Sequence, residues 1–307
     1  MTRKAFAAVS MLLLGTAISQ QSGPGGAGFA DLNGDVINYE YYDFGGFRLH
    51  MSERGLKWRG VGGEFDGVTA LVTPQVSKVA DGIYFMSWPT MGEGGDNVVV
   101  NFDAMTVNAH LGGGNRFRLI TGVIHCHNSS DCPAPEGDPM RPDQVMQTLM
   151  ANRQRAGRGG PPGGPGGPGA PPPAGPLSDA DQAAREALRG MALRYESDDG
   201  TINVEIADDA TLVSIDGADA ASHATHATQI AGDIFFISWG GPHGGNHIVF
   251  NTTTMQVFDQ IMSDGTRKEA ISLPMRSTAP EDRDALYEDY GRKLDSDSRD
   301  ESWSTEH

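Results

Sequence analysis

Hydrophobic and polar residues alternate along the chain in short runs rich in Val, Ile, Phe and Tyr, and Gly and Asp turns separate these runs. Such spacing is typical of antiparallel strands that close into a barrel or a sandwich. Helical periodicity is confined to three places, after Pro142, after Ser178 and near Pro280. The pattern therefore predicts a mainly β protein with a few short helices.

One part of this pattern occurs twice. Residues 82–102 read GIYFMSWPTMGEGGDNVVVNF, and residues 233–251 read DIFFISWGGPHGGNHIVFN. Each copy has a hydrophobic run that ends in Ser-Trp, then a Gly-rich loop, and then a second hydrophobic run that ends at an Asn. The copies differ by one residue in the loop, so we expect two tandem units of one fold. Trp88 and Trp239 occupy equivalent positions before the loop and are predicted to be mostly buried.

A Gly/Pro-rich segment separates the two copies. Residues 157–176 contain 17 Gly or Pro residues out of 20. This composition cannot bury enough apolar surface to fold, which predicts a disordered linker. The predicted organisation is a signal peptide (1–19), a first domain with a C-terminal extension (31–153), the linker (154–177), a second domain (178–278) and an acidic tail (279–307).

The N-terminal residues predict export. Arg3 and Lys4 precede an apolar run, and Ala17-Ile18-Ser19 has the small residues of a cleavage site. The run is too short to span a bilayer, so we expect no membrane insertion and a periplasmic or secreted location. The formal net charge of -17 repels phosphate backbones and anionic lipids, which argues against nucleic-acid partners.

The two cysteines of the chain lie in the segment HCHNSSDCP. In an oxidising compartment the default for such a pair is a disulfide, here between Cys126 and Cys132. A His/Cys metal cluster is the alternative that this segment leaves open.

The repeated pattern resembles a known family. A Gly-Ile-Tyr strand, a Ser-Trp pair, a polar turn, a Val-rich strand and a closing hairpin are similar to the calycin-like barrels of molybdenum cofactor biosynthesis protein F, whose superfamily includes bacterial phenolic acid decarboxylases. The resemblance covers about residues 32–111 and 194–262. It implies two tandem calycin-like antiparallel β-barrels, each with an apolar interior that opens at one end. It also implies that a small hydrophobic or aromatic molecule binds in a barrel cavity.

The decarboxylases of this superfamily carry a Tyr-x-Tyr pair on the first strand, an Arg on a later strand and a Glu two residues after the Trp. Tyr39 and Tyr41 match the tyrosine pair, but no Arg lies near Gly67, and Thr90 and Gly241 stand at the two Glu positions. Decarboxylation requires a group that orients the carboxylate and an acid that protonates the carbon. A binding protein is therefore the first hypothesis, and a lyase acting on phenolic or related small acids is the alternative.

The candidate ligand-binding residues are mainly aromatic: Tyr39, Tyr41, Trp58, Trp88 and Trp239, with Arg59 as a partner for a ligand carboxylate. The alternative is that the aromatic residues are barrel core, since small barrels fill their interiors with large side chains. Strand alternation places Trp58 and Arg59 on opposite faces, so only one of them can point inward.

The second copy carries histidines that the first copy lacks. His226 stands where the first copy has Gln75, and His247 stands where it has Asn97. With His243 in the Gly-rich loop, these imidazoles predict a site for a divalent transition metal, which would assist a lyase. The alternative is ordinary loop and surface histidines, because the sequence contains neither an HExxH motif nor paired-Cys spacing.

Overall fold

The computed structural model describes residues 28–42, 44–89, 95–113, 116–156, 179–197, 200–207, 210–240, 246–254, 256–263 and 266–272. Within these residues the chain is mainly β with few helices, as predicted. None of the described helices is long and apolar enough to cross a membrane. The predicted signal peptide, the Gly/Pro-rich segment 157–176, His243 and the helix expected near Pro280 lie outside the described residues.

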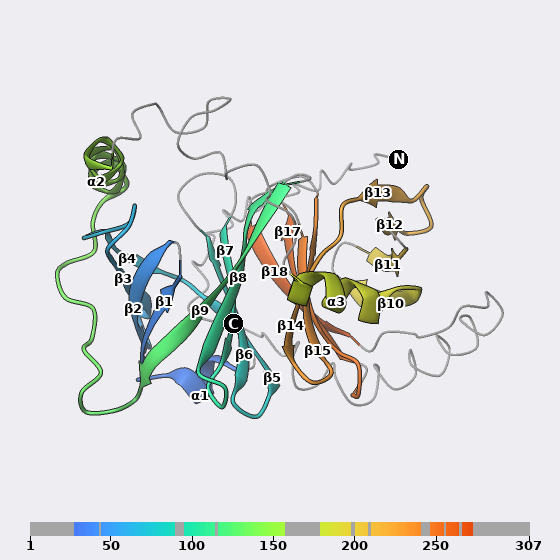
Figure 1. Cartoon of the computed structure of the whole chain (residues 1–307), viewed down its shortest axis with the longest axis horizontal. Coiled ribbons are helices and arrows are strands. Elements are labelled where there is room, and N and C mark those ends of the chain that lie inside the picture. Colours follow the sequence, from blue (N-terminus) through green and yellow to red (C-terminus); the bar gives the residue numbers. More distant parts are fainter. Residues whose placement is uncertain are drawn as a thin grey trace, which may run out of the picture.

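The first half of the chain forms one nine-stranded antiparallel sheet in the order β4-β3-β2-β1-β9-β8-β7-β6-β5. Consecutive strands are neighbours except at one place, where β9 returns to pair with β1 and leaves β4 and β5 as the edges. The sheet therefore curls on itself (Figure 1). Its strands are β1 (Val36–Tyr41), β2 (Gly45–Ser52), β3 (Gly55–Val61), β4 (Thr69–Val72), β5 (Gln75–Ala80), β6 (Ile83–Pro89), β7 (Gly95–Asn101), β8 (Thr106–Gly113) and β9 (Arg116–His127).

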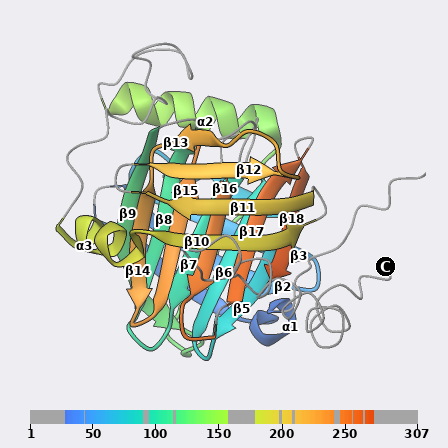
Figure 2. The ribbon, with the colours of Figure 1, turned by 90° about the vertical axis from the view of Figure 1, so that its right-hand side faces the viewer.

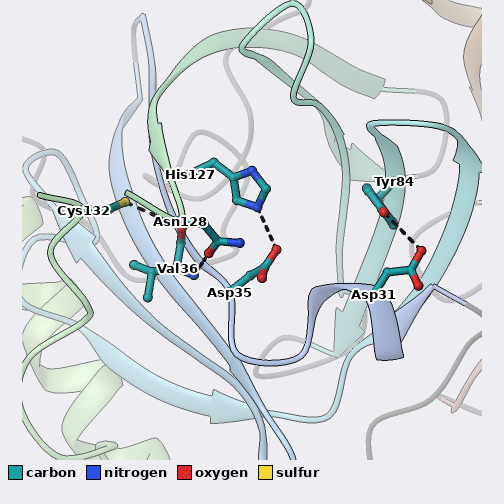
Figure 3. A network of polar contacts seen from close by, with 7 residues as sticks. All are labelled: Asp31, Asp35, Val36, Tyr84, His127, Asn128 and Cys132. Carbon is teal, nitrogen blue, oxygen red and sulfur yellow. Dashed lines mark hydrogen bonds and ion pairs between the residues drawn. The ribbon is translucent and has the colours of Figure 1, made fainter. Parts of the chain in front are cut away.

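The short helix α1 (Phe29–Leu32) covers one end of this curled sheet. Leu32 is buried in the core of the first half, and the Tyr84 hydroxyl donates a hydrogen bond to Asp31 at 3.3 Å (Figure 3). On the other side of the same end, His127 Nε2 lies 2.7 Å from Asp35 Oδ2, and the His127 ring stacks on Phe102. Apolar and polar contacts thus fix α1 and its flanks across this end.

The extension after β9 is tied back to the sheet. Cys126 and Cys132 form a disulfide with a Cα–Cα distance of 5.6 Å, as predicted. Helix α2 (Pro142–Arg155) begins at the predicted Pro142 and continues to Arg155, past the start of the predicted linker. The Asn152 side-chain amide donates to the Glu64 and Asp66 carbonyls, each at 2.8 Å, which fixes α2 against the loop between β3 and β4.

The disulfide closes a short loop, so its removal should have a moderate effect. We expect Cys126→Ser with Cys132→Ser to lower the free energy of unfolding by about 2 kcal/mol, because the denatured chain gains loop entropy. Urea unfolding measures this change. Thiol labelling of the non-reduced wild type should find no accessible cysteine, and two reactive thiols per chain would contradict the pairing.

The second half repeats these strand pairings, except that β10 and β18, the equivalents of β1 and β9, end two separate sheets. Helix α3 (Asp179–Leu188), predicted after Ser178, is followed by a four-stranded sheet, β10 to β13, and a five-stranded sheet, β14 to β18. The two sheets cross steeply, one in front of the other (Figure 2). The strands are β10 (Met191–Ser197), β11 (Gly200–Ile206), β12 (Thr211–Ile215), β13 (Ala221–His223), β14 (His226–Ala231), β15 (Ile234–Trp239), β16 (Asn246–Asn251), β17 (Gln256–Ser263) and β18 (Thr266–Ser272).

Strand register confirms that the two sequence copies are structurally equivalent. Strands β5, β6 and β7 pair with one another as β14, β15 and β16 do, including a register shift at the same place in the first pair. In the second half His226, Ser238 and His247 stand opposite one another in one row across three strands. The equivalent row of the first half is Gln75, Ser87 and Asn97.

The two halves pack against each other through equivalent outer faces. Figure 1 shows strands β5 to β9 beside β14 to β18 in the middle of the molecule. The buried contact contains four pairs of equivalent residues from the two halves, and in one of them the Phe85 and Phe236 ring centroids lie 5.6 Å apart. The shared cluster is Val79, Ile83, Phe85, Val99, Ile230, Ile234, Phe236, Val249 and Phe258. This arrangement resembles the isologous interface of a homodimer, within one chain.

Candidate functional site

An aromatic cluster occupies the inner face of the first half, away from α1. Alternation along β1, β2 and β3 turns these side chains inward, and the loops that follow β1 and β3 add two phenylalanines. Neighbouring rings lie with centroids 5.2 to 6.2 Å apart, and the rings are Tyr39, Tyr41, Phe44, Phe47, Trp58 and Phe65. Trp88 belongs to the same buried core. Four of the six predicted ligand-binding residues are thus brought together.

A carboxylate lies at this end of the core. Asp96 stands opposite Trp88 across β6 and β7, and its Oδ2 accepts a hydrogen bond from Trp88 Nε1 at 3.0 Å. Burial, followed by the Asp96 charge, raises the pKa of the Tyr39 phenol. Burial, followed by Tyr39 and then Asp96, raises the pKa of the Tyr41 phenol well above its ordinary value. Both phenols are therefore uncharged at neutral pH and can donate hydrogen bonds.

Two polar atoms of the cluster lack a partner among the described residues. Trp58 Nε1 and the Tyr41 hydroxyl oxygen are buried and make no hydrogen bond to any of those residues. A buried donor without an acceptor costs about 1–3 kcal/mol. The cluster is therefore apolar in its walls and rich in hydrogen-bond donors.

The other two predicted ligand-binding residues lie elsewhere. Arg59 points to the outer face, opposite to Trp58, and its guanidinium donates to Thr69 Oγ1 at 3.2 Å and to the Glu136 carbonyl at 3.3 Å. Trp239 is 1 % exposed in the core of the second half. The aromatic cluster of the first half therefore has no contribution from either residue.

Histidines gather at the interface between the halves. The His226 and His247 rings both contact Phe117 of β9, with centroids 5.0 and 5.3 Å away. Among the described residues no group of three or more His, Cys, Asp or Glu side chains is placed to hold a metal ion. Because His243 is outside those residues, the three-histidine metal site stays a prediction.

Two residues of these sites were missed by sequence reasoning. Asp96 stands on the strand after the loop, and only its cross-strand position opposite Trp88 would have indicated it. His110 of β8 is 3 % exposed and bonds to hydroxyl groups of the other half. No local sequence pattern indicates a contact between residues so distant in sequence.

Comparisons with known proteins give little further information. No family model matches the chain, and no curated protein matches it. One similar solved structure is described as a "putative beta-lactamase" from Burkholderia vietnamiensis. It is 18% identical over 31% of this chain and 93% of that chain, with a TM-score of 0.28. A similarity at this level supports no inference about fold or function.

Proposed function

We propose that each half of the chain is a calycin-like barrel, and that the first barrel binds a small aromatic or hydrophobic molecule. The observation that carries this proposal is the aromatic cluster with its unpartnered Trp58 donor, at the end away from α1. A bound molecule with an acceptor atom would satisfy that donor while its ring packs on the aromatic walls. The disulfide is compatible with an exported, periplasmic or secreted protein.

The second half supplies a comparison for the same positions. Counted from the paired strands, Phe47 corresponds to Ile202 and Trp58 to Val213. Both aliphatic residues are buried in the core of the second half. The second half is therefore filled by aliphatic side chains at these two positions, while Tyr195 and Trp239 stay aromatic at the positions of Tyr39 and Trp88. The comparison favours a ligand-related role for Phe47 and Trp58.

The donors favour a particular class of ligand. The phenols of Tyr39 and Tyr41 are neutral, and the indole of Trp58 offers an N–H group. We therefore expect a flat aromatic compound that carries a carbonyl or carboxyl acceptor, such as 4-hydroxycinnamate or 4-hydroxybenzaldehyde.

Calorimetric titration with these two compounds tests the proposal. The wild type should bind at least one of them saturably. The double variant Phe47→Ile with Trp58→Val installs the residues of the second half and should weaken binding at least about tenfold, the equivalent of 1.4 kcal/mol. Leu49→Val, another change toward the second half on the same inner face, is the matched control and should leave affinity unchanged. Absence of saturable binding, or equal losses in variant and control, would overturn the proposal.

A lyase is the second candidate, and Asp96 favours it. The carboxyl group stands beside the tyrosine pair and could supply the acid that is missing at Thr90. Decarboxylation of 4-hydroxycinnamate breaks a C–C bond, releases CO₂ and requires one proton on the side-chain carbon. Chromatography should then detect 4-vinylphenol with the wild type but not with Asp96→Asn, while both proteins bind the acid. Binding without conversion in the wild type would leave the binding role alone.

A further inference from the structure

A chain of hydrogen bonds crosses the interface between the two halves. It joins Asp181 of α3, Thr228 of β14, His110 of β8, Ser238 of β15 and His247 of β16. The distances along it are 3.2 Å from Thr228 Oγ1 to Asp181 Oδ1, 3.0 Å from Thr228 Oγ1 to His110 Nε2, 2.7 Å from His110 Nδ1 to Ser238 Oγ and 2.7 Å from Ser238 Oγ to His247 Nδ1. Only His110 comes from the first half, so it is the link that ties the halves together.

When both imidazoles are neutral, one assignment of protons satisfies every bond in this hydrogen-bond chain. The Asp181 carboxylate only accepts, so the Thr228 hydroxyl donates to it and accepts from His110 Nε2–H. His110 Nδ1 then carries no proton and accepts from the Ser238 hydroxyl, which in turn accepts from His247 Nδ1–H. His110 is thus neutral, with its single proton on Nε2.

A second proton on His110 forces the hydrogen bonds to rearrange. Both of its nitrogens would then donate, so Ser238 would have to turn its hydroxyl hydrogen toward His247 Nδ1, and His247 would have to carry its proton on Nε2. The ring has no room to move away, because it stacks on Phe236 with centroids 3.9 Å apart and an interplanar angle of 16°. Protonation would place a positive charge on a side chain that is 3 % exposed and lies near the His226 and His247 imidazoles, which opposes the packed arrangement of the two halves.

We propose that this hydrogen-bond chain is a proton-sensitive link, in which uptake of a proton by His110 places a positive charge in the buried interface and loosens the contact between the two halves. Asp181 stands at the α3 end of the hydrogen-bond chain and is partly exposed, so it offers a route by which protons from solvent reach the buried His110 imidazole. Phe117, which packs on His226 and His247, begins β9 at the end of the first half opposite α1. Loosening would therefore extend to the strands beside the aromatic cluster.

Burial and the neighbouring imidazoles disfavour a proton on His110, whereas the Asp181 carboxylate acts in the opposite direction. Burial, followed by the His247 and His226 imidazoles, lowers the pKa of His110 well below its ordinary value. Burial, then Arg185 of α3, also lowers the pKa of His226, and Asp181 partly offsets this. The Asp181 carboxylate itself faces His110 through Thr228.

The contact between the two halves should weaken at low pH. In an opened state His110 takes up a proton near its ordinary pKa of about 6.5, whereas the packed state excludes that proton. The contact is therefore at full strength above about pH 6.5 and weakens as the pH falls below that value.

The first half contains a natural control for the proposal. At the equivalent place Ser87 Oγ donates to Asn97 Oδ1 at 2.6 Å, an amide that does not titrate. Gln260 stands at the position equivalent to His110. His110→Gln therefore installs a side chain that the other half carries at the same place.

Amide hydrogen exchange of the full-length protein, normalised for intrinsic exchange at each pH, tests the link. Between about pH 7.5 and about pH 5, protection of the β8, β15 and β16 amides should fall at least about tenfold more in the wild type than in His110→Gln. His125→Gln, a change at an exposed histidine, should behave as the wild type. Equal losses in wild type and His110→Gln, or unchanged protection of the wild type at about pH 5, would overturn the proposal. If His110→Gln proves unfolded by circular dichroism, His110→Asn, which likewise cannot take up a proton, replaces it with the same expected result.

Discussion

Truncation of Trp239 to Ala is expected to lower the free energy of unfolding by about 3–5 kcal/mol, the range for a large aromatic residue removed from a core. The side chain is 1 % exposed and packs with Tyr195, Phe235 and Phe250 in the second half. Its removal leaves a cavity that the surrounding strands cannot fill, because hydrogen bonds to β14 and β16 hold β15 in register. Urea unfolding followed by circular dichroism measures the loss.

The matched control is Trp239→Phe, which keeps most of the volume and removes the indole N–H. Trp239 Nε1 has no partner among the described residues, so the loss of this group carries no hydrogen-bond penalty. We expect a clearly smaller destabilisation than for Ala. A loss below about 1 kcal/mol for Trp239→Ala would mean that the residue is not a core residue.

Substitutions of Phe85 and Phe236 test the packing of the two halves. We expect each to lower the free energy of unfolding about as much as Trp239→Ala does. Both rings are 0 % exposed, and both lie on outer faces that would be exposed to solvent if the halves were separate. Each change to Ala should cost about 3–5 kcal/mol. In a double-mutant cycle the pair should show a coupling energy of about 0.5–1.5 kcal/mol, as expected for contacting aromatic rings.

The control for this cycle is Val61→Ala, since Val61 is 39 % exposed and should change stability by less than about 0.5 kcal/mol. Additive effects of Phe85→Ala and Phe236→Ala, each as small as that of the control, would show that the halves do not pack through these faces in solution.

Much of the fold could be predicted from the sequence because local patterns encode it. The repeat predicted equivalent strands, and the registers of β5 to β7 and β14 to β16 agree with the sequence alignment. Trp88 and Trp239 are buried, as predicted, because each is a large residue on the inner face of a strand. The helices after Pro142 and Ser178 and the cysteine pair also follow from local signals.

The packing of the halves could be predicted only in part. The runs 83–88 and 234–239 are hydrophobic except for one serine each, which is typical of strands buried on both faces. This pattern indicates that something covers the outer face, but it does not say that the equivalent face of the other half does so. The role of His110 depends on that packing, so it could not be inferred before the packing was known.

The aromatic residues of the candidate site were predicted from the sequence, but its charged groups were not. Tyr39, Tyr41, Trp58 and Trp88 gather as expected, because alternation places all four on one face. Strand alternation also shows Arg59 pointing outward, which removes it from the site. Asp96 enters through a cross-strand pairing, and such pairings are fixed by register and not by sequence neighbours.

The most direct test of ligand binding in the first half is nuclear magnetic resonance of the indole N–H groups during titration with 4-hydroxycinnamate. Trp58 and Trp239 are assigned with their Phe variants. We expect the Trp58 indole signal to shift saturably, because the ligand acceptor bonds to its unpartnered Nε1, while the Trp239 signal stays in place. A Trp58 signal that does not move at saturating ligand, or a shift confined to Trp239, would contradict ligand binding at the aromatic cluster.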